Sequence, residues 1–193
     1  FDIIALMKEA EQPRKIAFVG TSCIGKTTVF EHYKQQFAGN PQVAFVEEAA
    51  RIFFQANPDV GDRFSADAQG KVQALALQTE QDAQATGARV ILCDRSVIDA
   101  VAYVKAHGDP EGSDRLLENV AFWLPTYHRF LLLDPVGVPY ATDDVRQEDA
   151  DKRQQFHDTF ISLLNKKRIP YELVGGTLEE RIRRVDQILE TED

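Results

Sequence analysis

The sequence has few cysteines, no long apolar run and no excess of positive charge. Cys23 and Cys93 are the only cysteines in 193 residues. Their spacing fits neither a disulfide framework nor a zinc site, so we expect a reduced, cytoplasmic setting. The longest apolar runs have the length of one buried strand, well short of the roughly 18 residues that a membrane span needs. The formal net charge of −9 argues against a protein whose main partner is a nucleic-acid backbone.

Short apolar runs alternate with amphipathic stretches along the chain. The apolar runs predict five strands, at residues 15–19, 43–46, 90–93, 130–133 and 171–174. Helices are expected between them and at the two ends, near residues 3–10, 27–37, 47–56, 66–86, 97–106, 115–124, 156–164 and 177–189. Strands that are each followed by a helix pair in parallel, with both faces of the sheet covered. We expect a single α/β domain over residues 1–193 that binds ligands at the carboxyl ends of its strands.

The stretch "FVGTSCIGKTTVF" contains Gly-x-x-x-x-Gly-Lys-Thr between a predicted strand and a predicted helix. Glycines let such a loop curl so that backbone N–H groups face the phosphates of a nucleoside triphosphate. Lys26 is expected to reach the β- and γ-phosphates of ATP or GTP, and Thr27 to bind Mg²⁺. The expected nucleotide-binding residues are Gly20, Thr21, Ser22, Cys23, Ile24, Gly25, Lys26, Thr27 and Thr28.

Two further segments follow strands and carry charged residues. Asp94 and Arg95 end the third strand, where Asp94 is the expected partner of Mg²⁺, with Asp134 as a rival. Arg95 and Asp99 are assigned to the acceptor, although an ordinary Asp–Arg pair would also explain the segment. After the second strand, Glu47 and Arg51 are four residues apart and would share a helix face. Glu47 is a candidate general base, with Asp94 and Glu48 as alternatives, and Arg51 would hold the acceptor.

The polar segment at about residues 137–153 is long for a plain connection, which predicts a lid. Arg146 and Arg153 of the lid would neutralise charge on the transferred phosphoryl group, although the segment could also be a solvated acidic loop. A lid and an acceptor pocket exclude water, as a kinase requires. No glutamine or asparagine is evident that would orient a water molecule for hydrolysis. The sequence therefore favours a kinase.

The blocks "GTSCIGKT", "EEAAR", "CDRSVIDAVAY" and "DDVRQED" resemble, in this order, the small P-loop kinases of the nucleoside and nucleotide kinase group. The order is most similar to ribosylnicotinamide-kinase-like, AAA-type predicted ATPases, which include the kinase half of the bifunctional NAD-biosynthesis regulator. The resemblance covers about residues 15–190. It implies a three-layer P-loop NTPase fold with strand order 2-3-1-4-5 and a lid between the fourth and fifth strands. It also implies that Gly176 passes near the adenine.

The resemblance places Asp94 at the metal, Arg95 at the acceptor or phosphoryl group, and Arg146 on the lid. The lid is acidic, which favours an uncharged or cationic nucleoside, with ribosylnicotinamide first. We predict a Mg²⁺-dependent kinase with Lys26, Asp94, Glu47, Arg95 and Arg146 in catalytic roles. A regulatory NTPase that acts on a protein partner is the alternative. A polynucleotide 5′-hydroxyl kinase is disfavoured by the charge.

Overall fold

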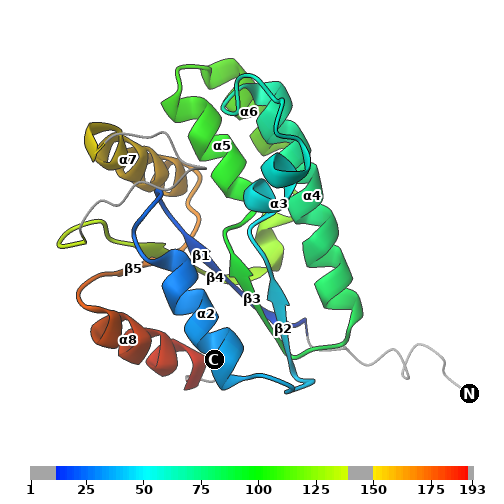
Figure 1. Cartoon of the computed structure of the whole chain (residues 1–193), viewed down its shortest axis with the longest axis vertical. Helices are drawn as coiled ribbons and strands as arrows, with labels where there is room; N and C mark the ends of the chain where they lie inside the picture. The colour runs from blue at the N-terminus through cyan, green and yellow to red at the C-terminus, as the bar shows by residue number, and fades with distance from the viewer. Residues whose placement is uncertain (1–11, 139–149, 191–193) are drawn as a thin grey trace, which may run out of the picture.

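A computed structural model describes residues 12–138 and 150–190, which form one parallel sheet between two layers of helices (Figure 1). The strands are β1 (Arg14–Val19), β2 (Val43–Val46), β3 (Val90–Asp94), β4 (Tyr127–Leu133) and β5 (Tyr171–Val174). The helices are α2 (Lys26–Gln36), α3 (Ala49–Ala56), α4 (Ala66–Ala85), α5 (Val97–Ala106), α6 (Pro110–Val120), α7 (Ala150–Lys166), α8 (Leu178–Glu190) and the short 3₁₀ helix η1 (Leu124–Thr126).

The strand order is β2-β3-β1-β4-β5, and each pair of neighbouring strands is parallel. This confirms the predicted fold class and strand order. Successive residues of β1 point to opposite faces of the sheet. Ile16 and Phe18 pack with α2 and α8 on one face, whereas Ala17 and Val19 pack with the layer of α3 to α7 on the other. Because the strands are parallel, the loops that follow them meet at one edge of the sheet.

Several element boundaries differ from the prediction, among them the starts of α6, β4 and α7, which begins at Ala150 and not near residue 156. The helix expected at residues 115–124 is α6, which begins at Pro110. Asp109 caps it by accepting a hydrogen bond from the N–H of Gly112 at 2.7 Å, and proline suits the first helical turn. The Asp-Pro pair therefore starts this helix and does not break the chain. β4 begins three residues earlier than expected, because its first residues pair with β1.

The inner face of α8 agrees in part with the predicted stripe of Leu178, Ile182, Val185 and Leu189. Val185 is buried, and Ile182 and Leu189 pack partly buried against the core, but Arg181 and Ile188 are buried as well. Leu178 is 39% exposed. The helix predicted near residues 3–10 lies outside the described residues. No helix within the described parts of the chain is long and apolar enough to cross a membrane.

Candidate functional site

The loop between β1 and α2 forms a tight cradle that its glycines make possible. Gly20 has φ +126° and Gly25 has φ +85°, a region that residues with a Cβ rarely adopt. A Cβ on Gly20 would lie 2.9 Å from Cδ1 of Ile24. Gly25 is the N-cap of α2, and its carbonyl accepts a hydrogen bond from the N–H of Val29 at 3.1 Å. The N–H groups of the first turn have no partner within the helix, so they can bind an anion.

Lys26 lies inside this cradle, with 4% of its surface exposed. Its ammonium donates a hydrogen bond to the carbonyl of Thr21, within the same loop. Burial, and then the positive charge of Arg95, lower the pKa of Lys26 to about 7. An anion bound in the cradle would restore the proton, because an opposite charge favours the charged form. Lys26 can therefore hold a phosphate and take up a proton as it does so.

The end of β3 supplies a carboxylate to the cradle. The hydroxyl of Thr27 donates to Oδ2 of Asp94 at 2.8 Å, and Oδ1 of Asp94 is buried with no hydrogen-bond partner among the described residues. Burial raises the pKa of Asp94, with a further contribution from Glu48. Hydroxyl and carboxylate oxygens suit Mg²⁺, so this pair fits the metal that a P-loop uses. Bound there, Mg²⁺ would neutralise charge on the phosphates.

Asp134, the rival residue, lies elsewhere at the same edge. Its backbone N–H donates to the carbonyl of Val174 at 2.9 Å, and its Oδ1 accepts from the N–H of Val136 at 2.9 Å. It packs against Gly175, in the turn after β5. The structure brings Asp94 to Thr27 and places Asp134 on the other side of the cradle.

Arg95 is the centre of a buried polar network beside the cradle. Its Nε donates to Glu48 at 2.7 Å, and its Nη1 donates to Asp99 and to the hydroxyl of Tyr103, both at 3.0 Å. Nη1 also lies 3.3 Å from the carbonyl of Gly20. Desolvation by burial alone would lower the pKa of Arg95, but Tyr103 and then Glu48 hold this pKa well above its usual value. A cation with this many partners is held in one orientation against the phosphate loop.

The backbone of Arg95 is also unusual, with φ +78°. Such a conformation costs about 1–3 kcal/mol in a residue other than glycine, and it persists only where its surroundings fix it. Here the N–H of Arg95 donates to the carbonyl of Phe18 at 3.0 Å. Asp99 closes the capping box of α5 with Ser96, and burial raises the pKa of Asp99. Asp99 thus orients Arg95 and caps a helix at once.

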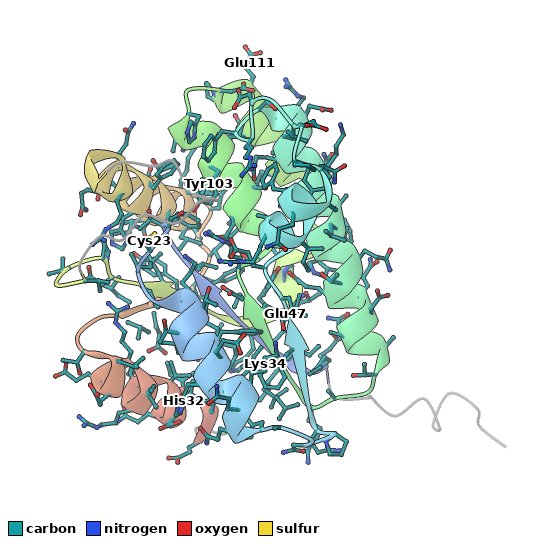
Figure 2. All side chains as sticks on the ribbon, in the orientation of Figure 1. Cys23, His32, Lys34, Glu47, Tyr103 and Glu111 are labelled. Atoms are coloured by element: carbon teal, nitrogen blue, oxygen red, sulfur yellow. The ribbon has the colours of Figure 1, made fainter. Side chains whose placement is uncertain are left out.

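The structure corrects the expectation that Glu47 and Arg51 share a helix face. α3 begins at Ala49, so Glu47 precedes the helix and forms an ion pair with Lys34 at the surface, where 47% of its side chain is exposed. Figure 2 shows Glu47 beside Lys34 and apart from Tyr103. Glu48 points inward instead, and Nε of Arg51 lies 3.5 Å from its Oε2. The inner carboxylate after β2 is therefore Glu48.

A pocket opens beside the phosphate loop and runs between α3, α4 and α5. Its lining includes Ser22, Glu48, Asp94 and Arg95, and the more exposed Glu47 and Arg51. Small and apolar side chains, two glutamines and Glu80 also line it, and this set includes Ala49, Phe54, Gln69, Val72, Gln73, Ala76 and Ala100. The structure thus brings Asp94 and the Arg95 network to the wall of one pocket.

Three pocket residues were missed from the sequence. Tyr103, whose hydroxyl lies 3.1 Å from Oγ of Ser22, follows Asp99 by one helical turn, so the spacing of Arg95, Asp99 and Tyr103 could have indicated it. Gln69 and Gln73 are both 4% exposed. They are also one turn apart, and two amides on an otherwise apolar stripe are a signal that could have been recognised.

The remaining predicted residues lie around the cradle. Thr21 is fully buried, and its hydroxyl has no partner among the described residues. Cys23 has a left-handed backbone, with φ +55°. Thr28 lies in the first turn of α2, and Gly176 has φ +88° in the turn before α8. Arg146 lies outside the described residues. The roles predicted for all these residues stay predictions.

Comparison with known proteins gives a consistent result. A family model described as an AAA domain matches residues 15–181. A comparison with curated protein sequences found no match. NadR protein in complex with NAD and AMP-PNP has a TM-score of 0.72 and 16% identity, over 94% of this chain and 50% of that chain. NadR protein in complex with NR has a TM-score of 0.73 and 16% identity, with the same coverage of both chains. The chain therefore spans half the length of these NadR chains.

Thymidylate kinases have the same fold at low identity. The enzyme from Candida albicans has a TM-score of 0.64 and 18% identity, over 93% of this chain and 92% of that chain. The enzyme from Ehrlichia chaffeensis has a TM-score of 0.62 and 14% identity, over 92% of this chain and 98% of that chain. These likenesses show that the fold is that of the small P-loop kinases, as the sequence predicted. With its intact phosphate loop and a family match over most of its length, this chain belongs to the AAA domain family and is a nucleotide-binding P-loop domain.

Proposed function

We propose that this chain is a Mg²⁺-dependent kinase that transfers the γ-phosphoryl group of ATP or GTP to a hydroxyl of a small, nucleoside-like acceptor. The observation that carries the proposal is the pocket beside Ser22 and Asp94. A phosphoryl acceptor has to lie next to the γ-phosphate, at the mouth of the phosphate loop. A regulatory NTPase needs no second pocket of this kind at that place.

The lining of the pocket supports an acceptor without negative charge. The amide of Gln73 donates to the carbonyl of Val97 at 3.0 Å, and that of Gln69 donates to the carbonyl of Arg63 at 2.7 Å. Each bond uses one of the two N–H donors of the amide and leaves the side-chain carbonyl to accept a bond from a ligand. With Glu48 and Asp94 nearby, these acceptors suit ligand hydroxyl, amino or cationic groups, while Arg51 and Arg63 are donors in the same lining. The NadR structures with NAD and with NR make ribosylnicotinamide the first acceptor to test.

The pocket is narrow in this structure. It encloses about 90 Å³, less than the roughly 150 Å³ of a cavity that holds benzene. A nucleoside therefore enters only if one wall moves outward. The loop before α4 is the candidate, because its Arg63 and Phe64 line the pocket. Phe64 is stacked on His107 with ring centroids 3.8 Å apart, a surface contact that can open.

The roles that we propose follow the geometry. Lys26 and the loop amides bind the donor phosphates, and Thr27 and Asp94 hold Mg²⁺. Asp94 is a better candidate for the base than Glu47, since the Glu47 carboxylate is bound to Lys34. Arg95 faces the phosphoryl group, while Glu48 and Asp99 fix its orientation. We retain a lid at about residues 137–153 that carries Arg146 as part of the proposal.

The test is ADP release from Mg·ATP, alone and with nucleosides, nucleoside monophosphates and ribosylnicotinamide. We expect one uncharged or cationic acceptor to stimulate release, and Lys26→Ala to abolish it. Two adjacent variants give a matched comparison. Glu48→Gln should lower the stimulated rate about tenfold or more, since it removes a charge-assisted hydrogen bond to Arg95. Glu47→Gln should leave the rate unchanged.

Two results would contradict the proposal. If every acceptor leaves ADP release unchanged while a protein partner increases it, the chain is a regulatory NTPase. If Glu47→Gln and Glu48→Gln lower the rate equally, the inward carboxylate has no special part in the reaction.

A further inference from the structure

Arg181 is a buried arginine on α8 that the roles above do not use. Only 3% of its surface is exposed, and it lies one turn before Val185 on the inner face of the helix. A guanidinium is costly to bury, so its position calls for a specific set of partners.

Its partners are three backbone carbonyls from three different loops. Nη1 donates to Ile24 of the phosphate loop, Nη2 donates to Asp134 after β4 at 2.7 Å, and Nε donates to Gly176 after β5 at 2.9 Å. One planar group therefore joins the phosphate loop to the two loops on its β4–β5 side. Those loops come together at the carboxyl ends of the strands, where ligands bind in such sheets.

The bond to Ile24 has a directional consequence. The described peptide bonds are all trans, and a planar trans peptide points its C=O and its N–H in opposite directions. Because Arg181 holds the carbonyl of Ile24 on one side, the N–H of Gly25 is turned to the other side. A Cβ on Gly25 would lie 3.6 Å from Nη1 of Arg181, so the guanidinium lies directly behind the loop.

The charge of Arg181 is not neutralised by an ion pair with any described residue. Its hydrogen bonds go to neutral carbonyls. Desolvation by burial lowers the pKa of Arg181, the carboxylate of Asp134 opposes this, and the positive charge of Arg153 adds to it. A bound polyphosphate would add negative charge on the side of the loop, without touching Arg181.

From these contacts we propose that Arg181 is a positioning residue for the nucleotide phosphates: it aims the Gly25 N–H of the phosphate loop and provides a buried positive charge behind it. The inference rests on nucleotide binding at this loop, as in the proposed function. It predicts that the effect of Arg181 on affinity increases with the number of phosphates on the ligand.

Arg14, the first residue of β1, offers a matched control because it binds carbonyls of the same helix. Its Nη1 and Nη2 donate to the carbonyls of Leu189 and Ile188 at 3.0 and 2.8 Å, so it holds the C-terminal end of α8 as Arg181 holds the N-terminal end. It lies at the start of β1, at the opposite edge of the sheet from the phosphate loop. Loss of either arginine removes guanidinium–carbonyl bonds that join α8 to other parts of the fold, but only Arg181 reaches the phosphate loop.

The experiment measures binding of ADP, AMP and adenosine, by competition with a fluorescent ADP derivative, together with the melting temperature. The proteins are the unaltered chain, Arg181→Met, Arg181→Lys and Arg14→Met. We expect Arg181→Met to weaken ADP binding about tenfold or more, AMP less, and adenosine by under about twofold. Arg181→Lys keeps the charge but not the three contacts, so its loss for ADP should be smaller. Arg14→Met should lower the melting temperature and leave all three affinities unchanged.

Several outcomes would overturn the inference. Equal losses for ADP, AMP and adenosine in Arg181→Met would mean that the residue only supports the fold, and unchanged affinities would mean that it has no part in binding. If Arg181→Met does not fold, Arg181→Lys decides by the same criterion. Absence of ADP binding by the unaltered protein would overturn the nucleotide site and this inference together. Absence of an acceptor would affect only the kinase proposal.

Discussion

Replacing Glu80 by glutamine should destabilise the protein strongly, because it leaves the ammonium of Lys15 buried without a carboxylate. Nζ of Lys15 lies 2.7 Å from Oε2 of Glu80, and their side chains are 0% and 1% exposed. Trp123 donates to Oε2 of Glu80 at 2.7 Å, and Tyr127 donates to Oε1 at 2.5 Å. The rings of Trp123 and Tyr127 also face the ammonium, with centroids at 4.1 and 3.9 Å.

The expected loss is about 3–5 kcal/mol, the usual result of removing one partner of a buried ion pair. This is a large part of the roughly 5–15 kcal/mol by which most domains are stable. A double variant, Lys15→Met with Glu80→Gln, should recover about 2 kcal/mol or more of the loss. It removes the uncompensated charge. The carbonyl of the introduced glutamine can accept the bond from Trp123, and its amide N–H can donate to the hydroxyl of Tyr127, which now binds the other oxygen of Glu80.

The loss should also depend on pH in a definite direction. Burial lowers the pKa of Lys15 from 10.5, and Glu80 counteracts this, so removing Glu80 lowers the pKa further. Between the folded pKa and 10.5 the unfolded chain then binds more protons than the folded chain, and stability rises with pH. Because the folded pKa of Lys15 is lower in Glu80→Gln, this pH range begins at a lower pH there than in the unaltered protein. The difference in free energy of unfolding between the unaltered protein and Glu80→Gln should therefore be smaller at pH 9 than at pH 7.

Urea unfolding at pH 7, 8 and 9, followed by circular dichroism, measures these free energies. Asp67→Asn is the control, because Asp67 forms an exposed pair with Lys71 at 2.9 Å and should cost under about 0.5 kcal/mol. A loss below about 1 kcal/mol for Glu80→Gln, or a loss that grows with pH, would refute the reasoning. So would a double variant no more stable than Glu80→Gln alone.

Three further predictions concern the phosphate loop. The pKa of Lys26 is lowered to about 7, and a bound anion raises it. ADP affinity measured without metal should therefore fall as pH rises above 7, by up to about tenfold per pH unit. Calorimetry in buffers of different ionisation enthalpy should show that the protein takes up a proton on binding. Asp94→Asn should abolish the gain in ATP affinity that Mg²⁺ gives, while affinity in EDTA is retained, as titrations with and without the metal would show. Gly20→Ala should lower both the melting temperature and ADP affinity, since its Cβ would meet Ile24 at 2.9 Å with φ in the left-handed region.

The sheet and the phosphate loop could be predicted because their signals are local. β2 and β5 have the predicted bounds, since short apolar runs between polar segments leave little choice of register. The phosphate loop is recognisable because glycines at two fixed positions meet a steric requirement. Asp94 is ranked above Asp134 from the sequence because Arg95 and the N-cap of the next helix follow it. The structure places Asp94 beside Thr27, and its role at the metal stays a prediction.

The inward positions of Glu48 and Arg181 could not be predicted in the same way. Whether Glu47 or Glu48 points inward depends on where α3 begins, and helix boundaries are uncertain by one or two residues. The inward position of Arg181 depends on carbonyls of Ile24 and Asp134, which are far away in the sequence. An arginine beside an apolar stripe is normally expected at the surface, so only the three-dimensional contacts reveal it.

The buried charges divide the site into two halves of opposite character. On the donor side, Lys26 and Arg181 are both bonded to carbonyls, so their positive charges remain available to a polyphosphate, together with the N-terminus of α2. On the acceptor side, the charge of Arg95 is offset by two carboxylates, Glu48 and Asp99. Arg51 and Arg63 also line this pocket, and Nε of Arg51 lies 3.5 Å from Oε2 of the same Glu48. Comparing a nucleoside with its monophosphate in the ADP-release assay therefore tests whether the carboxylates or these arginines decide the charge of the acceptor that we propose.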